Sequence, residues 1–401
     1  MSVQVSQVAD CVSRYAARLH AAIGTGHEVA SPLGAWLVLA LAGPASTGAD
    51  RLALTEALGC DVEEAAHAAA DLLTDPHPLV ASAAAVWTRS GASLPGSFVR
   101  WRDGLPAAVT TGDLPGKTGL DAWARDHTFG LIDRFPLSGD DLYLVLATAL
   151  ATKVSWQVPF DLAPAASLGA GSPWTGQLER VLQTPARPGG HVQFIATSSQ
   201  AGDVIVHIAA AAGGLQVVSV AAMPDVAAGQ VLAAAYEIGS AHAAGLRIER
   251  RDLASLPLGE SPLWLLREVA AAADSCGAVL PAWSARSRHD LTAPGLGFAA
   301  AKNALVQNDD PWQAGQVAMA RYSRTGFEAA AITGFAVMSS ARLPGRHRHA
   351  ELRFGHPYAV VAVTTDTSGC SGPWHGLPVF SAWVSKPQDA ADDTAQPDGH
   401  R

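Results

Sequence analysis

Apolar residues recur at helical spacing through the N-terminal part of the chain. Between Val8 and Ile23 they fall at every third or fourth position, which predicts an amphipathic helix. Ala35 to Ala42 is almost wholly apolar, so a helix there has to be buried on every side, and Gly43-Pro44 ends it. The same pattern predicts two further helices, over 47–58 and 62–73.

Beyond residue 80 the pattern alternates between strands and helices. We expect strands over 83–88, 142–152, 204–208 and 215–222, a helix starting at Pro95, helices over 120–135 and 263–276, and a closing hairpin from 358–363 and 379–384. No linker or charge block interrupts this order, which favours one mixed α+β domain over residues 1–388. Residues 389–401 are acidic and polar and are predicted to be a disordered tail.

One segment does not fit an ordinary sheet. From Gly326 to Arg342 the chain has one acid, Glu328, followed by small and apolar residues, which is typical of a buried strand. It leads into Arg342-Leu-Pro-Gly-Arg-His-Arg-His349, which is basic and interpreted as an exposed loop. Proteins normally avoid an apolar strand next to an exposed loop, because such a strand can pair with other chains and aggregate. It is explicable if the segment adds to a sheet later, a known mode of recognition and switching.

Composition excludes several classes of function. The 401 residues are 49% hydrophobic and carry a formal net charge of -9, which argues against bulk nucleic-acid binding. The first 30 residues show no secretion signal, so we expect a cytoplasmic location, and no apolar stretch suits a membrane span. The four cysteines are scattered without a CxxC pair, which predicts ordinary thiols rather than a disulfide framework or zinc site.

Candidate chemistry elsewhere is weak. Gly295-Leu-Gly-Phe-Ala-Ala300 mimics a dinucleotide fingerprint but lacks the strand–turn–helix context. His347, His349 and His356 have no further ligand at metal-binding spacing. Neither a Gly-x-Ser-x-Gly elbow nor a His-Glu-x-x-His motif occurs. We therefore expect neither an enzyme nor a metal or cofactor site.

The order of several short motifs resembles the serpin family over roughly residues 8–388. The matching segments are Ser31-Pro32 with the buried helix after it, Thr128-Phe-Gly-Leu-Ile132, Ala149 to Phe160 with Lys153 and Trp156, Met223-Pro-Asp225, Leu280-Pro-Ala-Trp-Ser284 with Asp290-Leu291, Phe354-Gly-His-Pro-Tyr358, and Phe380 to Pro387. Each match is weak alone, but seven in the right order are specific. The chain is similar to a divergent, bacterial-type member.

The resemblance implies three β-sheets, about eight or nine helices and an exposed reactive-centre loop. It also implies a monomeric inhibitor that traps a serine (or cysteine) protease covalently, by loop cleavage and insertion into the main sheet. The hinge of the loop corresponds to Gly326, Phe327, Glu328, Ala329, Ala330 and Ala331, and family spacing puts the reactive bond at Ser340-Ala341. The breach and shutter, two regions that control insertion, correspond to Trp156, Thr148, Ser31 and Gln316.

Alternation indicates which loop residues insertion would bury. One face carries Phe327, Ala329, Ala331, Thr333, Phe335 and Val337, all apolar or small except the threonine. The triple alanine and this face favour an inhibitor.

Departures from the family favour a non-inhibitory binding protein on the same scaffold. Phe327 and Arg324 replace a small residue and a glutamate, while Gln316 and Thr148 replace a histidine and an asparagine. A phenylalanine at the first inserting position has to be forced under the sheet, at ~1–3 kcal/mol, and is expected to slow the first step.

The reactive bond has alternatives because the loop is long. Met338 would suit a chymotrypsin-like protease, whereas Arg342, Arg346 or Arg348 would suit a trypsin-like one. The arginines are equally well explained as a solvated basic loop tip.

Overall fold

A computed structural model describes residues 2–137, 142–186, 189–306, 312–327, 345–365 and 372–391. In these ranges the helices are α1 (Ser2–Ile23), α2 (Pro32–Ala42), α3 (Gly48–Leu58), α4 (Val62–Thr74), α5 (Gly96–Asp103), α6 (Lys117–Asp126), α7 (Ala228–Ala243) and α8 (Phe298–Leu305). Three short 3-10 helices cover Gly43–Ala45, Ala165–Leu168 and Leu253–Ser255. None of the described helices is long and apolar enough to cross a bilayer.

The central sheet is antiparallel and carries the predicted closing hairpin. Its order is β1 (Glu28–Ala30), β19 (Pro378–Val384), β18 (Tyr358–Thr364), β10 (Leu215–Ala221), β9 (Gly202–Ala211) and β8 (His191–Ser198). Its strands are buried along most of their length, because α7 covers one face and the main core covers the other. The hairpin expected from the sequence is confirmed by the β18–β19 pairing.

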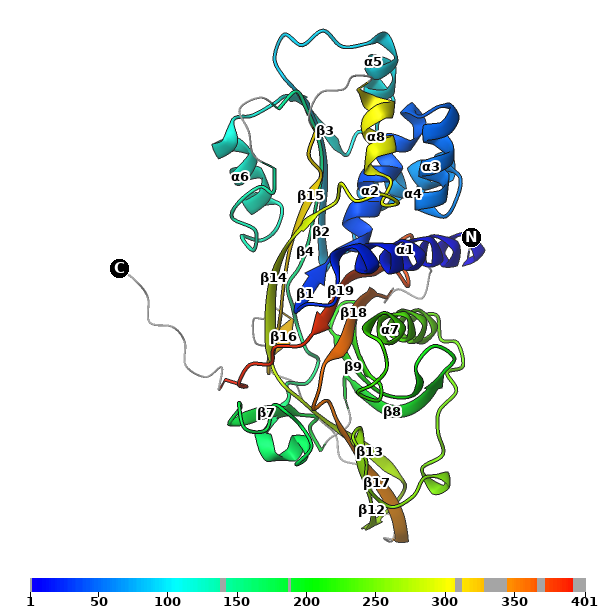
Figure 1. Ribbon diagram of the computed structural model, residues 1–401, viewed down its shortest axis with the longest axis vertical. Coiled ribbons are helices and arrows are strands. Elements are labelled where there is room, and N and C mark those ends of the chain that lie inside the picture. Colours follow the sequence, from blue (N-terminus) through cyan, green and yellow to red (C-terminus); the bar gives the residue numbers. More distant parts are fainter. Residues whose placement is uncertain are drawn as a thin grey trace, which may run out of the picture.

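A second sheet lies at one end of the molecule and corrects two predictions (Figure 1). Its order is β11 (Gly259–Glu260), β12 (Trp264–Ala271), β17 (Gly345–Arg353), β13 (Ser275–Leu280), β7 (Arg180–Gln183) and β6 (Asp161–Pro164). The helix expected over 263–276 is wrong, because β12 pairs along its whole length with β17. The exposed loop expected over 342–349 is wrong from Gly345 onward, where β17 begins.

The third sheet is divided lengthwise. One half contains β3 (Val109–Asp113), β2 (Val80–Thr88) and β4 (Leu144–Thr152). The other contains β14 (Trp283–Asp290), β15 (Gly315–Tyr322), β16 (Gly326–Phe327) and β5 (Val154–Ser155). Only Lys153 separates β4 from β5, so the halves form one sheet joined at one end. This gives three sheets and eight described α-helices, and the expected α+β architecture is confirmed.

Helices cover both faces of the divided sheet. Figure 1 shows α6 on one side, and α2 with α8 on the other. The helix expected over 120–135 ends at Asp126, because Phe129 and Gly130 both adopt positive φ (52° and 76°). Left-handed residues terminate a helix, and Gly130 is the kind of residue that favours this conformation. The turn that follows passes over the divided sheet.

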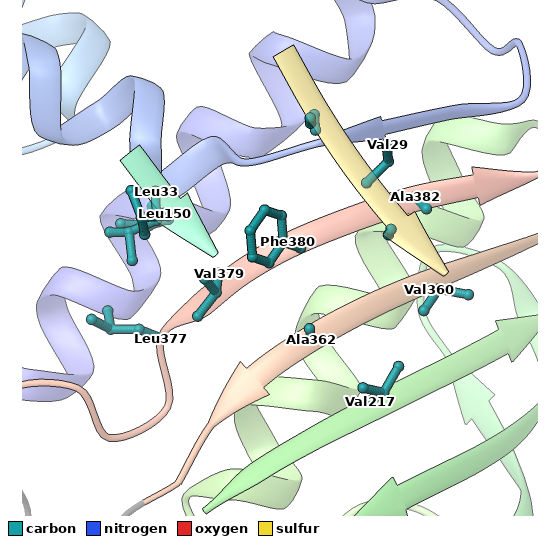
Figure 2. Packing of buried hydrophobic residues seen from close by; sticks show 14 of the residues in the cluster. Val29, Leu33, Leu150, Val217, Val360, Ala362, Leu377, Val379, Phe380 and Ala382 are labelled. Carbon is teal, nitrogen blue, oxygen red and sulfur yellow. The ribbon is translucent and has the colours of Figure 1, made fainter. Parts of the chain in front are cut away.

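Helix α2 supports the division between β4 and β15. Ser31 caps it by accepting a hydrogen bond from the Gly34 amide (3.3 Å), with Pro32 in the first turn. A Cβ at Gly34 would lie 3.3 Å from Leu150, so glycine permits the close approach of α2 to β4. Figure 2 shows Leu33, Leu150 and Phe380 together at this contact.

The chain remains held two residues beyond the expected end of the domain. The Asp389 carboxylate accepts hydrogen bonds from the Glu179 and Arg180 amides, and Ala390 is fully buried. The rest of the expected tail, from 392, lies outside the described residues.

Candidate functional site: the cleft between β4 and β15

At one end of the cleft a short strand lies between the two halves of the sheet. After β15 the chain turns at residues 323–325, where the Ser323 amide donates to the Gly326 carbonyl (3.0 Å). Phe327 then pairs with Tyr322 of β15 and with Val154 of β5. The first two predicted hinge residues, Gly326 and Phe327, therefore already occupy the position of an inserted strand.

Trp156, the predicted breach residue, holds this turn. Its amide donates to the Thr325 carbonyl and its indole N–H to the Ser323 carbonyl, both at 3.0 Å. Its ring lies 5.0 Å from that of Tyr322. Arg324 and Phe160 are joined twice, by the Phe160 amide to the Arg324 carbonyl and by Arg324 Nε to the Phe160 carbonyl, each 3.0 Å. The structure thus gives both Trp156 and Arg324 a role in fixing the hinge.

Phe327 is accommodated in the sheet. Its side chain is 3% exposed and meets the Trp283 ring edge-on, with the centroids 6.4 Å apart. The sequence predicted that this residue has to be forced under the sheet during insertion. In the structure its side chain is already buried between β5 and β15, so its burial is not an obstacle to later steps.

The three predicted shutter residues lie together at α2. The Gln316 side-chain amide accepts from the Ser31 N–H (2.9 Å) and donates to the Ser31 carbonyl (2.8 Å), as a neighbouring strand would. The Ser31 hydroxyl donates to the Val379 carbonyl (2.9 Å). Thr148, on the opposite side of the cleft, donates to the Gly34 carbonyl (2.7 Å). Each side of the cleft is therefore tied separately to the start of α2.

Between the breach and the shutter, no strand of the described residues lies between β4 and β15. Both β4 and β15 are described throughout, and no ladder pairing joins them. A cavity of about 700 Å³ occupies the gap, with apolar walls from α2, α6, α8 and both strands. A much smaller cavity of about 10 Å³ lies nearer the breach, beside Phe327, Leu150 and Ala320. Phe380 borders both cavities.

Several predicted loop residues cannot be placed. Glu328, Ala329, Ala330, Ala331, Met338, Ser340, Ala341 and Arg342 lie outside the described residues. Two alternative cleavage positions are placed, and both belong to β17. Arg348 donates to the Leu253 and Leu256 carbonyls (2.6 Å each), and Arg346 pairs with Glu268. A residue held within a paired strand is a poor protease substrate, so neither arginine suits a scissile position.

The histidines considered for a metal site are held by other partners. His347 contacts Asp274 (3.1 Å), His349 contacts Ser275 (2.9 Å), and His356 contacts the Ala222 carbonyl (2.7 Å). Within the described ranges no three His, Cys, Asp or Glu side chains gather as metal ligands would.

Sequence reasoning missed a second cluster beside the breach. His191 of β8 and His207 of β9 contact each other (3.1 Å), and His207 approaches the Tyr322 hydroxyl (3.5 Å). The two histidines are 16 residues apart on neighbouring strands, and no local spacing marks them as partners. Only a correct β8–β9 register would have brought them together.

Comparisons with known proteins agree with this architecture. No protein-family model matches the chain, and no curated protein matches it in sequence. Among solved structures it is similar to a thermophilic serpin, tengpin, in the native state (TM-score 0.65, 11% identity, 95% of this chain and 94% of that chain). It is also similar to human thyroxine-binding globulin bound to thyroxine (TM-score 0.64, 12% identity, 96% and 98%) and to a cleaved serpin, Serpin 42Da (TM-score 0.63, 13% identity, 98% of each chain). At this level of identity the likeness concerns the fold, and the chain has the serpin fold.

Proposed function

We propose that this protein is a serpin-type inhibitor of serine or cysteine proteases. The observation that carries the proposal is β16, because Gly326 and Phe327 already pair with both β5 and β15 at the mouth of an open, apolar cleft. A strand that continued in the register of Gly326 and Phe327 would run along the cleft. The segment predicted to be a late-inserting strand follows directly.

The register of β16 assigns partners to the following residues. If it continued, Ala329 would lie between Ala320 and Thr152, which are 2% and 3% exposed. Thr333 would come opposite Gln316 and Thr148. The face selected is the one predicted from alternation, with Phe327, Ala329, Ala331, Thr333, Phe335 and Val337 toward the core. The single hydroxyl on this face would thus meet the polar side chains of the shutter.

Insertion is favourable on simple energetic grounds. A full strand adds about ten ladder hydrogen bonds at ~0.5–1.5 kcal/mol each, or on the order of 10 kcal/mol. It also fills an apolar cavity within the size range of ligand pockets, about 300–1,000 Å³. Because Phe327 is already buried, its overpacking does not reduce this gain.

The chemistry belongs to the target protease. Its serine or cysteine nucleophile attacks the carbonyl of the residue before the reactive bond, Ser340-Ala341, and the amine of the next residue leaves with a proton. The resulting acyl ester or thioester joins protease and inhibitor. Insertion of the freed strand carries the acylated protease along the sheet before water completes hydrolysis. The alternative reactive positions are Met338 and Arg342.

The test is to incubate the protein with trypsin-, chymotrypsin-, elastase- and subtilisin-like enzymes. We expect an SDS-stable one-to-one complex with at least one enzyme, with the cut mapped by mass spectrometry to residues 338–342. Cleavage without any complex, and without a rise in melting temperature, would contradict the inhibitor.

A second candidate is a non-inhibitory binding protein. It is favoured by Arg324, which bonds to Phe160 where the family usually carries glutamate, and by the similarity to thyroxine-binding globulin. For this function we expect cleavage of the loop with no covalent complex, whichever protease is used.

A further inference from the structure

Tyr322, His207, His191 and the Val158 carbonyl form a directed chain of contacts beneath the breach. His191 Nε2 lies 2.7 Å from the Val158 carbonyl, which can only accept, so this nitrogen carries a proton. The Nδ1 of a neutral His191 is then an acceptor, and His207 Nε2, 3.1 Å away, must donate to it. The Nδ1 of a neutral His207 is left to accept from the Tyr322 hydroxyl, at a long 3.5 Å. The Val158 carbonyl therefore determines the tautomers of both neutral histidines, His191 and His207.

This chain connects the two halves of the divided sheet to the central sheet. His191 and His207 belong to β8 and β9, Tyr322 is the residue of β15 that pairs with Phe327, and Val158 lies in the turn after β5. The Phe160 ring packs against both imidazoles, with centroid distances of 4.5 and 5.3 Å.

Two backbone contacts hold the same turn to β9. The Gln157 amide donates to the Ala210 carbonyl (2.9 Å), and Trp156 forms a β-bridge with Ala211. The histidine chain is thus a side-chain attachment of this turn to the β8–β9 hairpin, beside the backbone bridge.

The pair is built to be neutral. His207 is fully buried, and burial, followed by the nearby His191, holds its pKa well below the ordinary value. Burial likewise lowers the pKa of His191. An added proton can find a hydrogen-bonded position, because the chain can reverse and the tyrosine oxygen can accept. What it lacks is an opposite charge, and burying an unpaired charge is costly.

The groups facing the pair do not supply that charge. Tyr322 of β15 and Tyr358 of β18 are both neutral phenols, because burial raises the pKa of each. From β10 comes the Ser219 hydroxyl, which lies opposite His207 in register. Arg324 reaches the same corner through Phe160 and is itself a cation.

We propose that His191 and His207 form a proton-binding site that controls the breach, so that acid releases the turn 156–160 from the β8–β9 hairpin. The released form binds the proton better than the closed form, because its imidazoles reach water. Release removes the attachment of the β4–β5 half of the sheet to the β8–β9 hairpin, while the bonds of Trp156 and Phe160 to residues 323–325 remain. Its consequence for strand insertion rests on the proposed function, whereas the release itself does not.

The experiment uses the intact, uncleaved protein without protease. Hydrogen exchange of peptides covering residues 154–160 is followed by mass spectrometry from pH 7.5 to 5.0, with rates corrected for the intrinsic pH dependence of exchange. In the native chain we expect protection of these amides to fall at least tenfold per pH unit at the acid end, because at least one proton is linked to opening. Peptides from the β12–β17 pair serve as the internal reference.

Two variants separate the pair from other titrating groups. Glutamine can donate to Val158 and accept from His207 without taking up a proton, so His191→Gln is expected to remove most of the pH dependence. His207→Gln is the second variant. It tests the proton site without changing the contact between His191 and Val158. The control is His20→Gln, since His20 is also a buried histidine but contacts Ser381 on β19. It should leave the profile of 154–160 unchanged.

The results test the proton site and the inhibitor function separately. If both glutamine variants at the pair keep the native pH profile, the proton site is wrong. If the profile flattens in the variants while no protease is trapped, the proton site stands and the inhibitor does not. If the native protein shows no pH-dependent exchange at 154–160, the histidines are structural only.

Discussion

The two ends of the cleft between β4 and β15 differ in how the sheet is closed. At the breach, β16 lies between β5 and β15, and Trp156 bonds to the turn that delivers it. At the shutter, Gln316 and Thr148 bond separately to the start of α2, and a cavity of about 700 Å³ lies between the strands. One end of the cleft thus holds a short paired strand, whereas at the other end β4 and β15 stay unpaired with each other and border a cavity. Substitutions at Glu328 with Ala329, at Phe327 and at Gln316 test this difference, and the buried His20 outside the cleft is a comparison site.

The first prediction exchanges two neighbouring hinge residues. In the double variant Glu328→Ala/Ala329→Glu the composition is unchanged, but the acid moves to the face that insertion buries. Burying it unpaired costs several kcal/mol, a large part of the gain of order 10 kcal/mol. We expect the rise in melting temperature on loop cleavage to be mostly lost. Glu328→Ala alone should retain that rise, and an unaffected double variant would mean that the register does not continue.

The second prediction concerns the closed end. Phe327→Ala removes a buried aromatic ring from its contact with Trp283, which typically costs ~3–5 kcal/mol of unfolding free energy. Chemical denaturation of the uncleaved protein measures the loss. Phe129→Ala is the control, because that ring is 54% exposed and its removal should change little. Equal effects of the two substitutions would argue against a seated Phe327.

The third prediction uses pH and His20, which lies outside the cleft. Burial, followed by nearby His289, lowers its pKa from 6.5 to about 4. The unfolded chain then binds the proton more tightly, so stability is full above pH 6.5, falls as the pH drops, and reaches its lowest contribution below pH 4. The total loss from this group is about 3 kcal/mol. His20→Gln should remove this part of the pH dependence of unfolding, and an unchanged pH dependence would refute it.

The fourth prediction concerns the open end. Gln316→Leu leaves the Ser31 amide and carbonyl without their side-chain partners, at ~1–3 kcal/mol. Thr148→Ser keeps the hydroxyl that bonds to Gly34 and should cost less. Urea unfolding of both variants measures the difference. A neutral Gln316→Leu would show that the shutter contacts do not hold the two sides of the cleft.

The sequence predicted much of the fold where periodicity was strong. The wholly apolar helix after Ser31 and the closing hairpin follow from local pattern, and both occur. The helix predicted for Leu263 to Cys276 was wrong. Its leucine, alanine, arginine and glutamate residues favour helices, but pairing with β17 imposes a strand. The end of α6 had a signal in the sequence, since Gly130 comes four residues after Asp126 and glycine is common just beyond a helix end.

The sequence predicted the breach and shutter residues of the candidate site but not its histidine pair or its cleft. The resemblance pointed to Ser31, Thr148, Trp156 and Gln316, and the structure brings Ser31, Thr148 and Gln316 together at α2. The histidine pair was missed because its members meet only through the register of β8 and β9. The open cleft was also invisible in the sequence, because a missing strand pairing leaves no mark in local pattern.

The most direct measurement is hydrogen exchange of β4 and β15 before and after a single proteolytic cut between residues 328 and 344. We expect amides of 144–152 and 315–322 facing the cleft to become strongly protected on cleavage, those of β12 and β17 to stay unchanged, and the melting temperature to rise. Unchanged exchange along both strands, with the loop fully cut, would contradict the claim that this cleft is prepared to receive a strand.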